Sequence, residues 1–285
     1  MKSNLAFFLS FTQARAALFI LMKVPREARP ACLFPEMARW SSVAMTPRGT
    51  TLGSIEGDAN IFLGARMLTF GGNGRNTVYS GLIKDGAFGH GGSLAKIGQC
   101  RVVLSNANTY TGGTSIQGGA LLINNLAGSG TGSGPVQVTA GRLGGTGTIA
   151  GAVTLGTGTG PGAVLSPGYA NKVNPGSLTV QNAVTFKSDA TYNLEVNSNM
   201  VTADRVTANG VVINAGAQLS ITDLATGTLS PGTTFTAIDT TATTRTSGTF
   251  ANLPAAGTVT VGSNSFQANY EGGDGNDLTL TVVGN

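Results

Sequence analysis

The stretch NTYTGGTSIQGGALLIN, residues 108–124, decides the fold of this 285-residue chain. Two Gly-Gly pairs separate three short segments that contain Thr, Tyr, Ile and Leu, and β-branched and aromatic residues favour strands. Glycine at the turns tolerates the positive φ angles that sharp corners require. A chain that turns every few residues and then repeats the pattern is typical of a coil of stacked strands.

Related phrases recur along the chain, namely AGRLGGTGTIAGAVTL at 140–155 and NGVVINAGAQLSI at 209–221. Repetition of one unit favours a β-solenoid, in which each coil stacks in parallel on the last, over an antiparallel sandwich or barrel. Valine, isoleucine and leucine would then point inward, and threonine and asparagine would lie outside or at corners.

Period-two alternation between residues 178 and 196 supports this all-β prediction. The side chains expected to face the core are Leu178, Val180, Val184, Phe186, Tyr192, Leu194 and Val196. Those expected on the opposite face are Thr179, Thr185, Asn193 and Glu195.

The composition argues against nucleic-acid binding. Charged residues make up only 11% of the chain, where about 25% is typical. Residues 1–50 hold seven Lys or Arg and two Asp or Glu, a balance of +5. Residues 51–285 hold ten and eleven, a balance of −1, so the net charge is +4. A nearly neutral body offers little for phosphate neutralisation.

Residues 1–50 form a leader that differs from the body at 51–285. Lys2, the apolar run Leu5–Phe11 and Ala14-Arg15-Ala16 are similar to a signal peptide with its cleavage site. The alternative is a segment that is not native to the protein. In both cases the leader is expected to be poorly ordered or partly helical. Its apolar runs are shorter than the ~18 residues of a spanning helix. The body is also not expected to span a membrane.

The core Asn108-Thr-Tyr-Thr-Gly-Gly-Thr114, with Gly118-Gly119 and the Leu/Ile strand after it, resembles the autotransporter-associated β-strand repeat, also called the passenger-associated transport repeat. The repeat core extends over 93–124. The resemblance continues more loosely over 52–285 and includes a tail, 248–278, similar to the C-terminal stretch of large secreted repeat proteins.

The resemblance implies a right-handed parallel β-helix in a bacterial protein that export machinery delivers to the cell surface or the medium. It does not imply a particular activity, because such passengers serve as stalks, adhesins and carriers. The repeat core, the low charge and the lack of a convergent catalytic set favour a structural stalk or scaffold, adhesive in some cases, without catalytic residues, metal or cofactor. A surface glycan or a protein of a host or neighbouring cell would be the partner. The alternative function is a carbohydrate-active or glycan-binding β-helix.

Two departures from the family pattern are notable. Gln99-Cys100-Arg101 stands where small turn residues are expected, which predicts a distorted coil. No membrane-barrel domain follows the repeat region, which predicts either a fragment of a larger passenger or another route of export.

Several residues could carry chemistry, and each has a structural interpretation that we favour. Gly272–Leu280 resembles one calcium-binding nonapeptide, but a single copy lacks the stacked neighbours that complete the ligand shell, so a hairpin turn is expected. His90 is expected to be a solvated loop residue, because no nucleophile motif accompanies it. Cys32 and Cys100 fit no metal spacing.

Pairs of acidic residues could also carry chemistry. General acid–base catalysis needs two carboxyl groups that converge on one cleft. The candidates are Glu56 with Asp58, Asp274 with Asp277, and the separated Asp204 and Asp223. Asp204 precedes Arg205, which predicts a surface ion pair or a turn contact. The stretches Gly128–Gly134 and Gly156–Gly162 lack the GK[ST] of phosphate loops and are expected to form corners.

Overall fold

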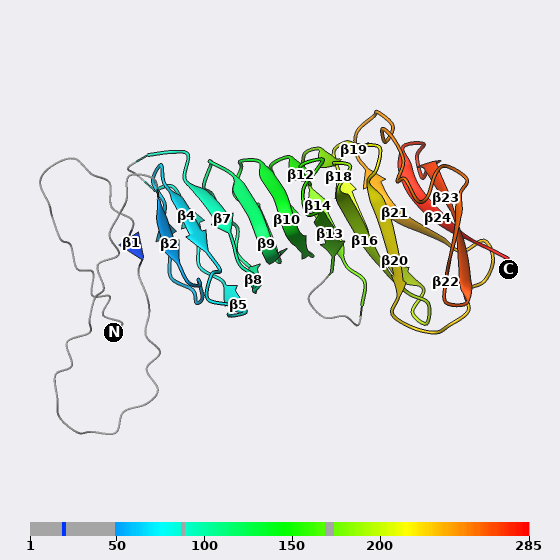
Figure 1. Cartoon of the computed structure of the whole chain (residues 1–285), viewed down its shortest axis with the longest axis horizontal. Helices are drawn as coiled ribbons and strands as arrows, with labels where there is room; N and C mark the ends of the chain where they lie inside the picture. The colour runs from blue at the N-terminus through cyan, green and yellow to red at the C-terminus, as the bar shows by residue number, and fades with distance from the viewer. Residues whose placement is uncertain (1–18, 21–48, 87–88, 169–173, 285) are drawn as a thin grey trace, which may run out of the picture.

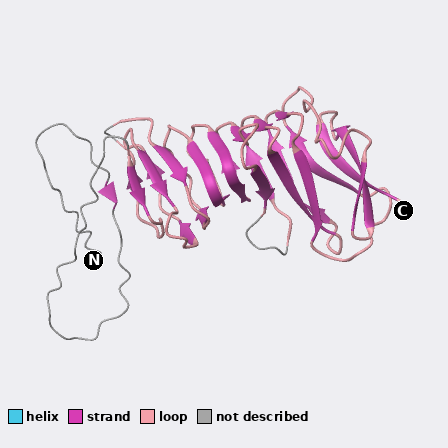
Figure 2. Ribbon diagram, viewed as in Figure 1, coloured by secondary structure: helices cyan, strands magenta, loops and turns pink. Residues whose placement is uncertain are grey.

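A computed structural model describes residues 19–20, 49–86, 89–168 and 174–284 (Figure 1). Most of the leader, including the predicted export signal and Cys32, lies outside these residues. Within the leader, β1 (Phe19–Ile20) pairs antiparallel with β3 (Ile61–Phe62) of the body. The described residues contain strands and loops but no helix (Figure 2), and therefore no helix that could cross a membrane.

Strand pairings arrange the body in three ladders, which we call faces A, B and C. Face A holds β2 (Thr50–Leu52), β4 (Met67–Phe70), β7 (Ser93–Lys96), the first parts of β9 (Thr114–Ile123) and β10 (Val136–Gly145), β12 (Val153–Leu155), β15 (Val184–Phe186) and β19 (Val211–Ile213). Face B holds β5 (Thr77–Tyr79), β8 (Arg101–Leu104), the last parts of β9 and β10, β13 (Ala163–Pro167), β16 (Ala190–Asn197) and β20 (Gln218–Asp223).

Face C is less regular. It begins with β3 and β6 (Ile83–Lys84) and continues with β11 (Thr148–Ile149), β14 (Ser177–Val180), β18 (Arg205–Ala208) and β21 (Thr234–Thr240). Loop backbone bridges the two parts, since Thr109 N donates to Ile83 O and Gly130 N donates to Thr148 O. All neighbouring strands that build these three ladders run parallel, which confirms the predicted parallel β-solenoid.

Each coil lies in register on the one before, although the coils differ in length. Along face A, Thr114 pairs with Val136, Val136 with Val153, and Val153 with Val184, so successive coils take 22, 17 and 31 residues. The strands keep their register, and the corners and loops absorb the extra residues.

Inward side chains form rows of apolar residues along the coil. One row on face B joins, through consecutive strand pairs, the buried side chains of Val102, Leu121, Leu143, Leu165, Tyr192 and Leu219. Such rows remove apolar surface from water at roughly 25 cal/mol per Å², which is the main term that favours folding.

The predicted inward and outward faces are confirmed with one exception. All seven side chains expected in the core are buried, and Thr179, Thr185 and Asn193 are half-buried on the opposite face. Glu195 was predicted to face outward but is buried. The reason is β17 (Thr202–Ala203), which folds back antiparallel on the end of β16 beside this position.

The corner at Gln99-Cys100-Arg101 accommodates one extra residue. Lys96 pairs with Ile116 and Arg101 pairs with Ala120, so four residues on one coil oppose three on the next. Pairing then resumes along all of β8, which limits the predicted distortion to the corner itself.

The parallel order ends at β21, where the sequence predicts a continuing solenoid. The last strands β22 (Thr258–Val261), β23 (Asn264–Gly272) and β24 (Asp277–Val283) pair antiparallel and form the C-terminal end of the molecule (Figure 1). Tight turns with left-handed glycines connect them, at Gly262 (φ 59°) and Gly273 (φ 58°). The predicted hairpin before the last strand is confirmed, with Leu278, Leu280 and Val282 buried.

Leu194→Asp should reduce the free energy of unfolding by at least about 3–5 kcal/mol, because it places a carboxylate in the apolar interior. Leu194 is fully buried. Urea denaturation followed by circular dichroism would measure the change.

Asn193→Asp is the matched control, since Asn193 lies on the opposite face and its amide reaches Ser166 Oγ at 3.3 Å. We expect this variant to lose less than about 1 kcal/mol, as surface substitutions usually do. Equal losses in the two variants would contradict the inward and outward assignment.

Candidate functional site

Asn108, in the repeat core, binds three successive coils together. Its Oδ1 accepts the N–H of Ile83 on the preceding coil at 2.8 Å, and its Nδ2 donates to the Gly130 carbonyl on the following coil at 2.6 Å. The side chain is buried, so both bonds form away from water. Leaving a buried polar group without a partner costs about 1–3 kcal/mol. Asn108 therefore fixes the spacing of the coils at this corner.

The other polar side chains of the repeat core also make structural contacts. The Tyr110 hydroxyl and Thr114 Oγ1 are buried and lie 2.5 Å apart. Burial raises the pKa of Tyr110, so this hydroxyl stays neutral. Thr111 Oγ1 donates to Asp85 Oδ2 on the preceding coil at 2.7 Å. Each of these hydroxyls joins segments of the coil to one another.

Two glycines of the repeat core are required by close approach of the backbone. A Cβ on Gly112 would overlap the carbonyl oxygen of Gly91 in the preceding coil. Gly119 has a φ of 62°, and a Cβ there would overlap the carbonyl oxygen of Cys100. A larger residue at either position would push neighbouring coils apart.

Lys96 is fully buried at an inward position of face A. Its Nζ donates to the carbonyls of Ile97 at 2.8 Å, Gly98 at 3.2 Å and Gly118 at 3.2 Å. Burial lowers the pKa of the Lys96 ammonium. The lysine thus satisfies three carbonyls where the chain turns from face A to face B. The buried Cys100 thiol donates to the Gly71 carbonyl at 3.1 Å nearby.

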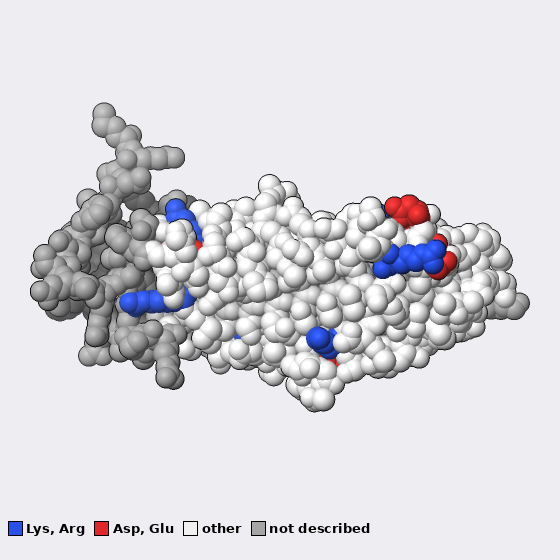
Figure 3. Space-filling view, turned by 90° about the horizontal axis from the view of Figure 1, so that it is seen from above, with Lys and Arg blue, Asp and Glu red and all other residues white. Residues whose placement is uncertain are grey.

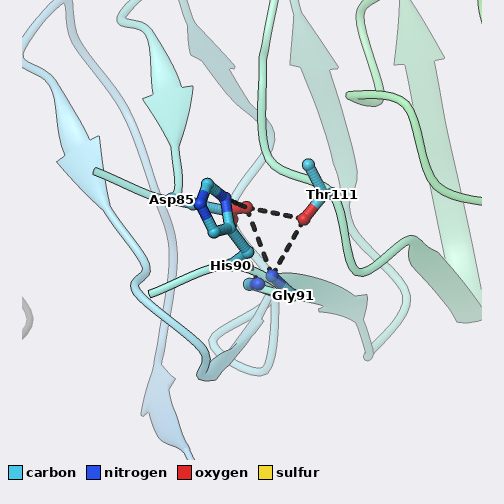
Figure 4. Close-up of polar contacts among 5 residues, drawn as sticks. Asp85, His90, Gly91 and Thr111 are labelled. Carbon is cyan, nitrogen blue, oxygen red and sulfur yellow. Dashed lines mark hydrogen bonds and ion pairs between the residues drawn. The ribbon is translucent and has the colours of Figure 1, made fainter. Parts of the chain in front are cut away.

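His90 lies in an exposed loop, as predicted, with 88% of its side chain accessible. Its Nδ1 is 3.9 Å from Oδ2 of the buried Asp85 (Figure 4). The carboxylate of Asp85 also accepts the N–H groups of Gly91 at 3.2 Å and Gly92 at 3.1 Å. The Thr111 hydroxyl donates to this carboxylate and accepts from Gly91 N at 2.8 Å, so it is not poised as a nucleophile.

The acidic candidates do not share one cleft. Glu56 is exposed and lies 3.7 Å from Arg75 in an ion pair. Asp58 is also exposed. Burial of the Tyr79 side chain raises the pKa of Tyr79, and the negative charge of Asp58 adds a smaller rise. Asp223 Oδ1 accepts the N–H of Ser198 at 3.0 Å and is occupied in a turn. These carboxylates serve separate local structures.

Asp204 differs most from its prediction. It is fully buried, and its two oxygens accept the N–H groups of Gly176 at 2.7 Å and Glu195 at 3.0 Å. The predicted turn contact is therefore present, but the predicted ion pair is wrong, since Arg205 pairs with Asp239 at 3.6 Å. Burial raises the pKa of Asp204 to about 7, the two N–H groups oppose this shift, and Glu195 adds to it.

The Gly272–Leu280 stretch forms the predicted hairpin, closed by the pair Gly272 and Asp277. Asp277 Oδ1 accepts the N–H of Thr240 at 2.8 Å, and burial raises the pKa of this carboxyl. Its oxygen is thus occupied within the sheet. Among the residues that the structure describes, no group of three or more His, Cys, Asp or Glu side chains could hold a metal ion.

Asp189 has a structural role that sequence reasoning missed. Its carboxylate accepts the N–H groups of Thr157 at 3.1 Å, Gly158 at 2.7 Å and Gly160 at 2.8 Å. Burial alone would raise the pKa of Asp189, but these backbone bonds hold it below its ordinary value. Asp189 thereby fixes the glycine-rich loop 156–162, which forms a corner as expected. No local pattern signals a contact across about 30 residues.

Asn108→Ala should destabilise the protein by about 2–4 kcal/mol, because the buried Ile83 N–H and Gly130 carbonyl both lose their partner. Chemical denaturation would measure the loss. Asn106→Ala is the control, since Asn106 donates to the Ser80 carbonyl at 2.9 Å beside solvent, where water can replace it. A loss at Asn108 no larger than at Asn106 would refute the role of this side chain.

The free energy of unfolding should fall as the pH rises from about 4 to about 7. In this interval the folded protein holds a proton on Asp204 that the unfolded chain releases near pH 4. The Asp204→Asn variant has no proton to release at this position. Denaturation at several pH values should therefore show that its unfolding free energy depends less on pH, by the equivalent of up to one proton. Identical slopes for both proteins would contradict a protonated Asp204 in the folded state.

Comparison with known proteins agrees with this geometry. The family model described as passenger-associated-transport-repeat matches residues 94–123. These residues run from β7 through β8 and the Asn108 corner to the end of β9. A search of the curated proteins finds no match. Residues 94–123 therefore match the passenger-associated transport repeat, which confirms the resemblance for the core of the predicted region.

Proposed function

We propose that this protein is a non-enzymatic scaffold of the autotransporter-passenger type, displayed on the bacterial cell surface or secreted, with an adhesive role. The observation that carries the proposal is the use of the polar side chains. The carboxylates of Asp85, Asp189 and Asp204 and the hydroxyl of Thr111 are groups that could carry chemistry by type, and Asp85 and Asp204 are also buried. All four bind groups of a neighbouring coil or loop.

The architecture supports a stalk. Each coil contacts mainly its neighbours, so coils add length without changing the fold, and stability accumulates along the axis. The molecule is elongated along this axis (Figure 1). The view in Figure 3 shows a largely uncharged surface, on which basic and acidic side chains lie side by side toward the C-terminal end and a few other basic side chains lie nearer the N-terminal end. Such a surface suits display better than binding of a highly charged polymer.

Mass spectrometry of the natural producer tests the proposal. Secreted and envelope fractions should contain peptides from residues 51–285, with a mature N-terminus at or before Thr51. Proteinase added to intact cells should remove the envelope-bound protein and spare a cytosolic marker. Protein found only in the cytosol with residues 1–50 intact would refute display outside the cell.

A further inference from the structure

An open groove of about 560 Å³ lies at the C-terminal end, between β23 and the loop 245–256. This volume falls within the ~300–1,000 Å³ of small-molecule sites. Gln267, Asn269 and Glu271 line the groove and alternate along β23 with buried residues. Because every second residue of a strand points to the same side, these polar groups stand about 7 Å apart.

Arg245 and Glu271 face each other across the two walls of the groove. Arg245 Nη1 donates to Glu271 Oε1, and both side chains are largely exposed. A guanidinium has five N–H donors and a carboxylate has two oxygens, so each group keeps hydrogen-bonding capacity beyond this bond. The opposite charges cancel, and the groove therefore does not favour an anionic or a cationic ligand.

The amide side chains add matched donors and acceptors. Asn269 Oδ1 accepts the N–H of Glu271 at 2.9 Å, and its Nδ2 makes no bond to another described residue. Gln267 Nε2 donates to the Ala256 carbonyl at 3.3 Å. The Gln267 Oε1 atom can still accept a hydrogen bond from a ligand. The groove thus offers a free donor and a free acceptor next to a neutralised ion pair.

The opposite wall holds a strained residue. Ala256 has a φ of 59°, a left-handed conformation that costs an alanine roughly 1–2 kcal/mol. Two backbone bonds hold it there, from Ala256 N to Ala268 O and from Ala268 N to Gly257 O, both at 2.9 Å. Ala256 lies in the tight turn that Gly257 N closes on Pro254 O at 2.8 Å, and strained residues of this kind occur at turns and at binding sites, so the turn holds the wall of the groove in a fixed shape.

We infer that this groove binds a short, uncharged oligosaccharide. Neighbouring sugar hydroxyls donate and accept at the same time, which matches the Arg245–Glu271 pair and the two amides. The exposed methyl groups of Ala255 and Ala256 offer a small apolar surface for the C–H face of a sugar ring. This inference rests on the proposed adhesive role and names a ligand class and a place for it.

A printed array of neutral and acidic oligosaccharides, probed with the full chain, followed by calorimetric titration of the ligands retained, tests the inference. Neutral oligosaccharides should bind. Arg245→Ala and Glu271→Gln should each weaken their binding roughly tenfold or more, because hydrogen bonds to charged groups are among the stronger ones. Arg75→Ala is the matched control, since it removes the exposed ion pair with Glu56 in the N-terminal coils.

Ala255→Trp should abolish binding by filling the groove, while thermal unfolding stays close to that of the unchanged protein because Ala255 is exposed. Three results would overturn the inference: no neutral oligosaccharide binds, only acidic glycans bind, or Ala255→Trp binds as well as the unchanged protein. Each would leave the test of surface display unaffected, so failure of the two ideas can be told apart.

Discussion

Every coil of this protein must return in register to the strand of the coil before it, and the rest of the structure depends on that constraint. Backbone bonds such as Thr114 N to Pro135 O and Val136 N to Ala152 O, both 2.8 Å, join the coils. A slip of one residue would turn an inward row outward and expose it to water. Coil length can therefore change from 17 to 31 residues only through loops, because the strands themselves have no freedom to shift.

The corners carry the consequence of this register. At each corner the ladder is interrupted, and buried backbone groups need other partners. Lys96 satisfies carbonyls, whereas Asp189 and Asp204 satisfy N–H groups, and Asn108 does both. Polar groups of these types can also carry chemistry. Here their bonds run to the backbone of neighbouring turns, so the same chemistry serves stacking.

The parts of the fold that depend on local pattern could be predicted from sequence. Alternation identified the buried face of β16, and the glycine-rich turn before β24 identified its hairpin. Contacts across a whole coil could not be predicted. Asp204 was expected to make a surface ion pair with Arg205 or a turn contact, but one of its oxygens binds the N–H of Gly176, 28 residues away. Glu195 was placed outside by alternation, which carries no information about a strand that folds back over it.

The groove lies at the end of the coil for a physical reason. Along the solenoid, each coil stacks in register on the previous one, so strand positions repeat from coil to coil. Where parallel stacking stops, β24, β23 and β22 extend the sheet of face C in antiparallel order, and the loop after β21 joins the last coil to them. That bridge contains the left-handed Ala256 and forms the wall of the groove. The constraint that makes the body uniform therefore also concentrates irregular, ligand-sized structure at its end.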